Sequence, residues 1–164
     1  MKPNDLIDLP RESDVSEANH SPLPGGSLDI IQPPTGAMME WISMPYVLVV
    51  DDEEPIRKLL ARWLTGWGYE SKEASNADEA IDLMNTEAAA IILCDVMMPV
   101  HDGIWLAEQV RTRWPQTAVI MASSAQDMET VMRMRKQGAI DYVTKPFGRE
   151  MLRQALLRAN EKIG

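Results

Sequence analysis

The stretch YVLVVDD, residues 46–52, decides the fold. Its first five residues are apolar and mostly β-branched or aromatic, which is typical of a strand that is buried on both faces of a parallel sheet. Two aspartates then end the run. Pro55 follows at a position that suits the first turn of a helix, and apolar residues continue at helical spacing as far as Trp67. The stretch therefore predicts a strand that leads directly into an amphipathic helix.

The same alternation of strand and helix continues along the rest of the sequence. Further strands are predicted at residues 69–73, 89–94, 117–122 and 140–144. Apolar residues at helical spacing fill each interval and follow the last strand. Because parallel neighbours in a sheet need crossover connections, the pattern predicts an α/β fold, a doubly wound five-stranded parallel sheet with five helices.

Local signals predict where some of these helices begin and end. Ser75 with Asp78 offers a capping box for the second helix, and Asp102 can cap the third. The fourth helix is expected at residues 126–137, with Gly138 in a position that favours a helix terminus.

Composition changes near residue 44, and the sequence suggests a domain boundary there. Residues 1–44 contain six prolines, clustered Ser and Gly, and two basic against seven acidic residues. Such a segment cannot bury enough apolar surface to offset its ordering entropy. A disordered acidic tail is therefore predicted, followed by one domain at residues 45–164. The apolar patch at residues 38–44 is either a docking element or a plain linker.

Charge and cysteine content exclude several classes of protein. A formal net charge of −9 argues against a broad nucleic-acid-binding or membrane-surface face. Cys94 is the single cysteine, so no internal disulfide can form. The sequence shows neither a secretory signal pattern nor an apolar run of membrane-spanning length. A cytoplasmic protein without membrane insertion is expected.

Polar residues stand at the ends of four of the predicted strands. They are Asp51 and Asp52 after the first strand, Asp95 after the third, Ser123 after the fourth and Lys145 after the fifth. The carboxyl ends of parallel strands share one edge of the sheet, where ligands bind in doubly wound folds. Three carboxylates, one hydroxyl and one amine are therefore expected to converge.

The chemistry of this set favours a divalent cation and a phosphate group. Two carboxylates about 4 Å apart repel each other by roughly 4 kcal/mol at an effective dielectric constant of 20, so three together require a cation. Magnesium prefers carboxylate oxygens, retained waters and phosphate oxygens. An aspartate would act as the nucleophile, while Lys145 and Ser123 would contact phosphoryl oxygens.

Four motifs resemble those of response-regulator receiver domains. They are VLVVDDEEPIRKLL at residues 47–60, IILCDVMMPVHDG at 91–103, VIMASSA at 119–125 and GAIDYVTKPF at 138–147. The resemblance covers residues 45–164 and implies the flavodoxin-like receiver architecture. It also implies a component of two-component or phosphorelay signalling that catalyses only its own phosphorylation and dephosphorylation.

The resemblance implies a role for each matching residue. Asp95 would be phosphorylated and share in binding Mg²⁺, Asp52 would bind the metal directly, and Asp51 would bind the metal or a metal-bound water. The main-chain carbonyl of Met97 would complete the protein ligands. The other three implied roles are a Ser123 hydroxyl that moves toward the phosphoryl group, a Tyr142 ring that turns inward with it, and a phosphate-pairing Lys145 joined to Pro146 by a cis peptide bond.

Three positions depart from the commonest pattern of the family. Ser124 follows the switch hydroxyl where many members have Ala or Gly, and its extra hydroxyl would affect the rate of phosphotransfer. Met97 and Ala125 occupy the positions that flank the attacking water in the family, and neither side chain can orient a water molecule. Slow self-dephosphorylation is therefore predicted.

Other notable side chains are given structural interpretations. His101 is expected to be a solvated loop histidine, since such residues are commoner than relays or ligands. Cys94 is expected to fill a buried apolar position in its strand. Met128, Met132 and Met134 are interpreted as core and partner surface.

Three functional hypotheses remain open. The first is a stand-alone phosphorylation switch that is served by a histidine kinase or a histidine phosphotransfer protein and binds a downstream protein target, with a phosphorylation-dependent homodimer also allowed. The second is the receiver module of a longer transcription factor or enzyme, or a phosphorylation-independent binding module. The third is a metal-dependent phosphatase, which is disfavoured because Met97 stands where a second acid–base carboxylate is needed. No direct contact with nucleic acid is expected.

Overall fold

The computed structural model describes residues 46–124 and 127–164. The predicted tail at residues 1–44 with its apolar patch, and Ala125, lie outside the described residues. The described part contains five strands and five helices in strict alternation.

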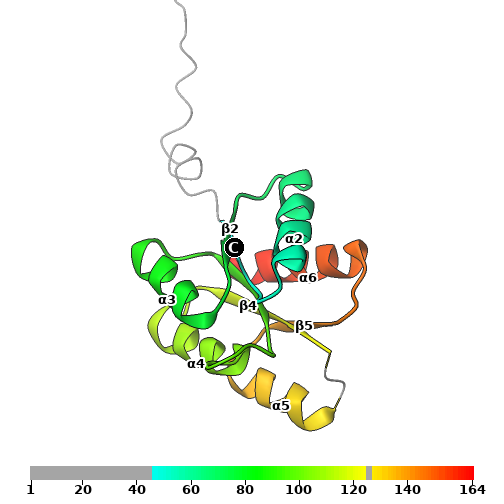
Figure 1. Cartoon of the computed structure of the whole chain (residues 1–164). Coiled ribbons are helices and arrows are strands. Elements are labelled where there is room, and N and C mark those ends of the chain that lie inside the picture. Colours follow the sequence, from blue (N-terminus) through cyan, green and yellow to red (C-terminus); the bar gives the residue numbers. More distant parts are fainter. Residues whose placement is uncertain (1–45, 125–126) are drawn as a thin grey trace, which may run out of the picture. The chain divides into compact units, whose positions relative to one another are not determined.

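The strands form one parallel sheet in the order β2-β1-β3-β4-β5 (Figure 1). The inner strands β1, β3 and β4 are buried along their whole length, as their continuous apolar runs predict. The strand bounds are Val47–Val50 for β1, Ser71–Ala74 for β2, Ile91–Asp95 for β3, Ala118–Ser123 for β4 and Asp141–Thr144 for β5.

Helices cover both faces of the sheet (Figure 1). Because successive strand residues point to opposite faces, Val47 and Val49 join the core under α2 and α6, while Leu48 and Val50 join the core under α3, α4 and α5. This arrangement confirms the predicted doubly wound fold. The helix bounds are Glu54–Gly66 for α2, Ala77–Thr86 for α3, Gly103–Arg113 for α4, Met128–Lys136 for α5 and Arg149–Ile163 for α6.

The strand register brings the predicted site residues to one edge. Val50 is the partner of Cys94 in the pairing of β1 with β3, so the residues that follow them, Asp51 and Asp95, lie side by side. Ser123 ends β4, the neighbour of β3 on its other side. The carboxyl ends of the central strands therefore lie level with one another.

The start of the second strand differs from the prediction for a local reason. Tyr69 closes α2 instead of starting β2, because its amide donates to the carbonyl of Leu64 at 3.0 Å. The amide of Gly68, whose φ is +84°, donates to the carbonyl of Thr65 at 3.0 Å. This is the Schellman arrangement of a helix end, and β2 begins only at Ser71.

The cap of α3 also differs from the prediction. Asn76 is the N-cap, and its side chain accepts a hydrogen bond from the amide of Glu79 at 2.8 Å. The Glu79 carboxylate accepts hydrogen bonds from the amide and hydroxyl of Ser75. The prediction of a box formed by Ser75 and Asp78 is therefore wrong by one residue, because the helix itself begins one residue later. Asp102 caps α4 as predicted.

The described helices are 9 to 15 residues long, which is typical of an α/β domain. Among the residues that the structure describes, no helix is both long and apolar enough to cross a membrane. The helix expected at residues 126–137 is observed as Met128–Lys136 with Asp127 as its N-cap.

Candidate functional site

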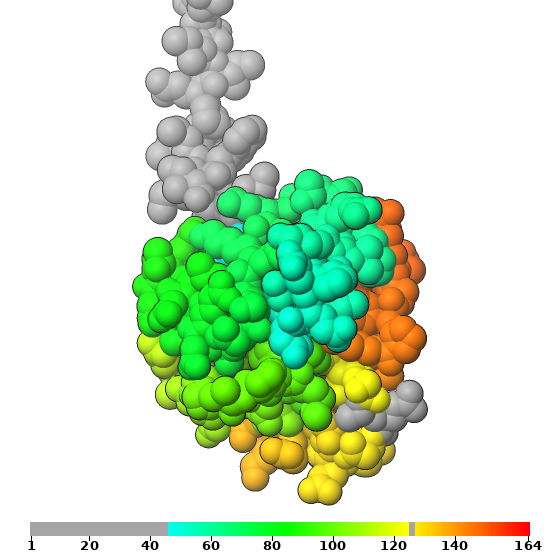
Figure 2. Space-filling view, in the orientation of Figure 1, coloured from blue at the N-terminus to red at the C-terminus, as the bar shows by residue number. Residues whose placement is uncertain are grey.

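The edge of the sheet where the strands end carries buried polar side chains. Asp51, Asp95 and Ser123 are 2%, 5% and 1% exposed, and no other polar or charged residue of the described chain is classed as buried. Burying such groups costs free energy unless they find partners, so their concentration at one edge marks a functional site. Figure 2 shows the start of α2 in cyan, the chain after β3 in light green and the chain after β4 in yellow meeting on one face.

Three carboxylates lie close enough to bind one cation. Oxygen atoms of Asp51, Asp52 and Asp95 all lie within 4.8 Å of one another, and Asp52 is exposed while the other two are buried. At such distances each pair repels by roughly 3 to 4 kcal/mol at an effective dielectric constant of 20, and a divalent cation relieves this repulsion. The donor set consists of hard carboxylate oxygens and is partly open to solvent. These residues therefore fit a hard divalent metal such as Mg²⁺.

Lys145 places a positive charge between the two buried carboxylates. Its Nζ lies 2.8 Å from Oδ2 of Asp51 and 3.3 Å from Oδ1 of Asp95. The Lys145 amide donates to the carbonyl of Ser123 at 2.8 Å, which continues the ladder between β4 and β5 beyond the strand end. The peptide bond to Pro146 is cis, as predicted.

The pKa values of Asp95 and Lys145 are both raised, for different reasons. Burial raises the pKa of Asp95, and the charge of Lys145 offsets this only in part. Burial acts to lower the pKa of Lys145, but its hydrogen bond with Asp51 and the charge of Asp95 outweigh burial and raise that pKa. The site therefore keeps an ammonium group next to a carboxyl group that takes up a proton more readily than an exposed aspartate does.

The loop after β3 presents main-chain groups to Asp95. The amide of Met97 donates to Oδ1 of Asp95 at 3.3 Å, while the Met97 side chain is 67% exposed. The amide of Gly103 donates to the carbonyl of Val96 at 2.9 Å and closes the loop at the start of α4. These contacts hold the Met97 main chain beside the carboxylates. The role of its carbonyl as a metal ligand stays a prediction.

The predicted switch residues lie on the last two strands. Ser123 ends β4 within the buried edge, and Tyr142 of β5 is half-buried against the core beneath α3, α4 and α5. Ser124 is exposed and lines a groove together with Lys145. The movements expected of Ser123 and Tyr142 stay predictions.

Two residues that the sequence did not single out shape the site. Arg57 of α2 donates from its guanidinium group to the main-chain carbonyl of Asp51 at 2.7 Å. Gly103 lets α4 approach β3 so closely that a Cβ at this position would lie 2.2 Å from the carbonyl oxygen of Asp95. Arg57 lies inside a quoted motif, but its partner depends on the angle at which α2 leaves β1, which residue spacing does not give.

The prediction of a solvated loop residue at His101 is correct only in part. Its imidazole stacks on Trp105 with ring centroids 3.9 Å apart, and its side chain is 38% exposed. Cys94 is fully buried as predicted, and burial raises the pKa of its thiol. Met134 lies in the core, whereas Met128 is 72% exposed on α5.

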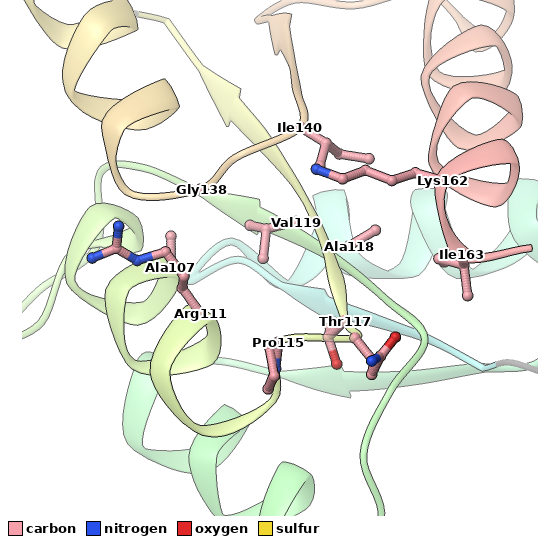
Figure 3. A pocket seen from close by; sticks show the side chains of 11 residues that line it. Ala107, Arg111, Pro115, Thr117, Ala118, Val119, Gly138, Ile140, Lys162 and Ile163 are labelled. Atoms are coloured by element: carbon pink, nitrogen blue, oxygen red, sulfur yellow. The ribbon is translucent and has the colours of Figure 1, made fainter.

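A separate cavity lies away from the carboxylates, at the other end of the strands. It has a volume of about 280 Å³ and opens between α4 and α6. Figure 3 shows Arg111 and Lys162 on either side of Ala118 and Val119 at the start of β4. None of the predicted site residues lines this cavity, so the candidate site is the edge that carries Asp95.

Comparison with known proteins points to one family. A family model described as the response regulator receiver domain matches residues 47–157, a range that contains every residue of the candidate site. The DNA-binding transcriptional regulator NtrC of Klebsiella pneumoniae is 35% identical over 99 residues, which are 60% of this chain and 21% of NtrC. The transcriptional regulatory protein SrrA of Staphylococcus aureus is 39% identical over 118 residues, which are 70% of this chain and 48% of SrrA.

A solved structure supports the same assignment. The chemotaxis protein CheY4 of Vibrio cholerae superimposes with a TM-score of 0.68 at 30% sequence identity, covering 71% of this chain and 98% of the CheY4 chain. The present chain spans less than half the length of the curated relatives NtrC and SrrA. The family model, the relatives and the fold agree, and the chain therefore belongs to the family of response regulator receiver domains, the phosphoacceptor modules of two-component signalling.

Proposed function

We propose that this chain accepts a phosphoryl group on Asp95 in a Mg²⁺-dependent reaction and that phosphorylation changes a protein-binding face. The observation that carries the proposal is the buried Asp95 carboxylate, which lies beside two further aspartates and within 3.3 Å of the Lys145 ammonium group. A nucleophile, a set of cation ligands and a partner for phosphoryl oxygens thus share one edge of the sheet.

The positions of the side chains support the following chemical step. A carboxylate oxygen of Asp95 attacks the phosphorus atom of a phosphorylated donor, and the bond from phosphorus to the donor breaks as the new oxygen–phosphorus bond forms. Mg²⁺ bound by Asp51, Asp52 and Asp95 would neutralise charge on the phosphoryl oxygens. In the unphosphorylated chain Lys145 is paired with two carboxylates. In the reaction it pairs with another phosphoryl oxygen. The Ser123 hydroxyl donates a hydrogen bond to a third.

The response to phosphorylation is proposed to run from β4 to the face of α5. A shift of Ser123 toward the phosphoryl group would be accompanied by an inward turn of Tyr142 on the paired strand β5. The neighbouring helix α5 exposes Met128 and Met132 at 72% and 64%. A change of this kind biases an equilibrium between two arrangements of that face. The face would bind a downstream protein target or a second phosphorylated copy.

The phosphodonor is proposed to be a histidine kinase or a histidine phosphotransfer protein. An apolar groove of about 370 Å³ lies next to Lys145, between Ile56, Leu59 and Trp63 of α2 and Phe147 of the β5–α6 loop. An apolar helix face of a donor protein can pack into such a groove while a phosphohistidine reaches Asp95. Protein contacts of this kind suit the acidic chain better than nucleic acid does.

A second candidate is the receiver part of a larger regulator. It is favoured by the relatives NtrC and SrrA, of which this chain matches 21% and 48%. In that case the phosphorylation chemistry proposed here would be unchanged, and DNA binding would belong to another domain. The cytoplasm is the proposed compartment in both cases, since a lone buried Cys94 suits a reducing environment.

The test is phosphorylation by acetyl phosphate, followed by intact mass. The wild-type chain is expected to gain one phosphoryl mass in the presence of Mg²⁺ and none after chelation. Asp95→Asn is expected to gain none, while Asp82→Asn, an exposed carboxylate of α3, is the matched control and should behave as wild type. Equal labelling of Asp95→Asn, or no labelling of wild type when a known receiver is labelled, would contradict the proposal and favour a phosphorylation-independent binding module.

A further inference from the structure

His101 connects three parts of the molecule that flank the candidate site. It lies in the β3–α4 loop, and its ring stacks on Trp105 of α4 at a centroid distance of 3.9 Å and an interplanar angle of 13°. Its Nδ1 lies 3.3 Å from Oδ1 of Asp78 in α3, although without the alignment of a hydrogen bond. The stack on Trp105 is therefore the stronger of the two contacts.

In the part of the loop before His101, a main-chain hydrogen bond runs from the amide of His101 to the carbonyl of Pro99 at 2.9 Å. Val96 and Met98 are buried and anchor the first half of the loop, but Pro99 and Val100 are exposed. Val100 is 90% exposed and has a φ of +68°, a conformation that costs free energy for a β-branched residue. A backbone in this state persists only where neighbouring contacts fix it, and His101 supplies the next such contact along the chain.

The same histidine lines a cleft together with Asp52, one of the proposed metal ligands. His101, Val100 and Pro99 line one side of a cleft of about 520 Å³, and Asp52 and the start of α3 line the other. Met97, at the opposite end of this loop, donates its amide to Asp95. A loosened outer half of the loop would therefore disturb the cleft next to Asp52 directly, and the Met97 main chain through Met98, the one residue between Met97 and Pro99.

We infer that His101 is a positioning residue for the divalent cation: by stacking on Trp105 it holds the β3–α4 loop in the arrangement that places the Met97 main chain at the acidic site. This inference rests on the proposed function, in which the Met97 carbonyl is a metal ligand. When only a fraction of molecules has the binding arrangement, the apparent dissociation constant rises by the inverse of that fraction. Loss of one aromatic stack is expected to raise it roughly 3- to 10-fold.

The test measures Mg²⁺ binding to the full chain by calorimetry, without any phosphodonor. His101→Ala is expected to raise the dissociation constant for Mg²⁺ by about 5-fold, and His101→Phe, which keeps a ring on Trp105, is expected to restore it to within about 2-fold of wild type. His20→Ala, a change of the other histidine in the chain, is the matched control. Hydrogen exchange of the amides at residues 97–101 should be faster in His101→Ala and restored in His101→Phe.

Phosphorylation separates this inference from the proposed function. With acetyl phosphate, His101→Ala is expected to need more Mg²⁺ for half-maximal labelling and to reach the wild-type rate at saturating Mg²⁺. The inference is overturned if His101→Ala binds Mg²⁺ with wild-type affinity, or if His101→Ala and His101→Phe bind Mg²⁺ equally weakly. In either case Asp95 would still be labelled, so the proposed function would stand. A wild-type chain that binds no Mg²⁺ would overturn the proposed function, and this inference with it.

Discussion

Lys145 is the residue on which the balance of charge in the site depends. Its ammonium group contacts Asp51 at 2.8 Å and Asp95 at 3.3 Å, and both carboxylates are almost fully buried. Lys145→Met keeps the apolar stem but leaves two buried carboxylates without their cation, so the free energy of unfolding should fall by about 3 kcal/mol in Mg²⁺-free buffer. Urea denaturation measures this loss.

The control for this prediction is Lys58→Met. Lys58 pairs with Glu73 at the surface, where its side chain is 61% exposed, and such pairs contribute roughly 0 to 1 kcal/mol. Under the proposed function Mg²⁺ neutralises the same carboxylates as Lys145, so saturating Mg²⁺ should stabilise Lys145→Met more than wild type. An equal effect of Mg²⁺ on both chains would argue that the cation binds elsewhere.

Asp95 should make stability depend on pH in an unusual direction. Because burial raises its pKa, the folded chain takes up a proton on Asp95 at a higher pH than the unfolded chain does. The contribution of Asp95 to the free energy of unfolding therefore falls as pH rises from the ordinary aspartate pKa through the raised one, and it remains unfavourable above that range. Asp95→Asn removes this ionisation.

The measurement compares denaturation curves of wild type and Asp95→Asn from about pH 4 to pH 7 without Mg²⁺. Asp95→Asn is expected to be the more stable chain at neutral pH, with the difference narrowing as pH falls. A less stable Asp95→Asn at neutral pH would mean that the pairing with Lys145 outweighs burial.

Met97 should determine how long a phosphoryl group stays on Asp95. Its side chain is 67% exposed beside the carboxylate and cannot orient a water molecule for attack on phosphorus. Met97→Asn introduces a group that can, and the lifetime of phospho-Asp95 is expected to shorten by about 10-fold, less than the roughly 100-fold or more of a true general base because an amide only orients the water. An unchanged or longer lifetime would show that another residue controls hydrolysis.

The sequence predicted the residues of the site better than the contacts among them. Asp51, Asp52 and Asp95 could be placed together because strand ends in a parallel sheet share an edge. His101 could not be placed, because stacking on Trp105 depends on the path of an irregular loop with a positive φ at Val100. Strand topology is encoded in hydrophobic pattern, whereas loop geometry is not.

At the level of the elements, α4 approaches β3 closely at Gly103. A Cβ on Gly103 would lie 2.2 Å from the carbonyl oxygen of Asp95 and 3.0 Å from Sγ of Cys94. Gly103→Ala must therefore move the helix or the strand, and a loss of about 3 kcal/mol is expected from overpacking. Gly148→Ala is the matched control, since a Cβ there would contact nothing within 4 Å.

Thermal unfolding and acetyl phosphate labelling together distinguish the outcomes for Gly103→Ala. We expect a lower unfolding midpoint and slower labelling of Asp95, because the displaced carbonyl belongs to the phosphoacceptor residue itself. Wild-type stability in Gly103→Ala would indicate that α4 can shift without cost. Gly148→Ala should change the free energy of unfolding by no more than about 0.5 kcal/mol.

The observed ends of the helices and strands show why the intrinsic propensity of residues predicts these ends only approximately. Tyr69 and Glu70 directly precede Ser71 and were predicted to belong to the second strand. The amide of Tyr69 instead takes part in the hydrogen bonds that end α2. Likewise Asn76 rather than Ser75 caps α3, a choice between two good capping residues. Both differences depend on which main-chain carbonyl and amide groups form hydrogen bonds at the helix ends. Amino-acid composition does not determine these pairings.

Across the described residues, the sheet separates two apolar cores. The core beneath α2 and α6 includes Leu60, Leu64, Leu152 and Leu156, and the other core begins at Tyr46. The domain boundary predicted near residue 44 lies just outside the residues that the structure describes. Its functional meaning, a tail that the domain does not need in order to fold, stays a prediction.

A chain that begins at residue 45 tests that prediction. Since the described cores draw on residues from Tyr46 to Ala159, the shortened chain is expected to unfold within about 2 °C of the full chain and to label on Asp95 at the same Mg²⁺ concentration. Removal of residues 149–164 is the contrasting control, because it takes away the fully buried Leu152 and Leu156 of α6 and should abolish cooperative unfolding. A midpoint lowered by more than about 5 °C in the chain from residue 45 would show that residues 1–44 stabilise the domain, and slower labelling at an unchanged midpoint would give them a role at the site instead.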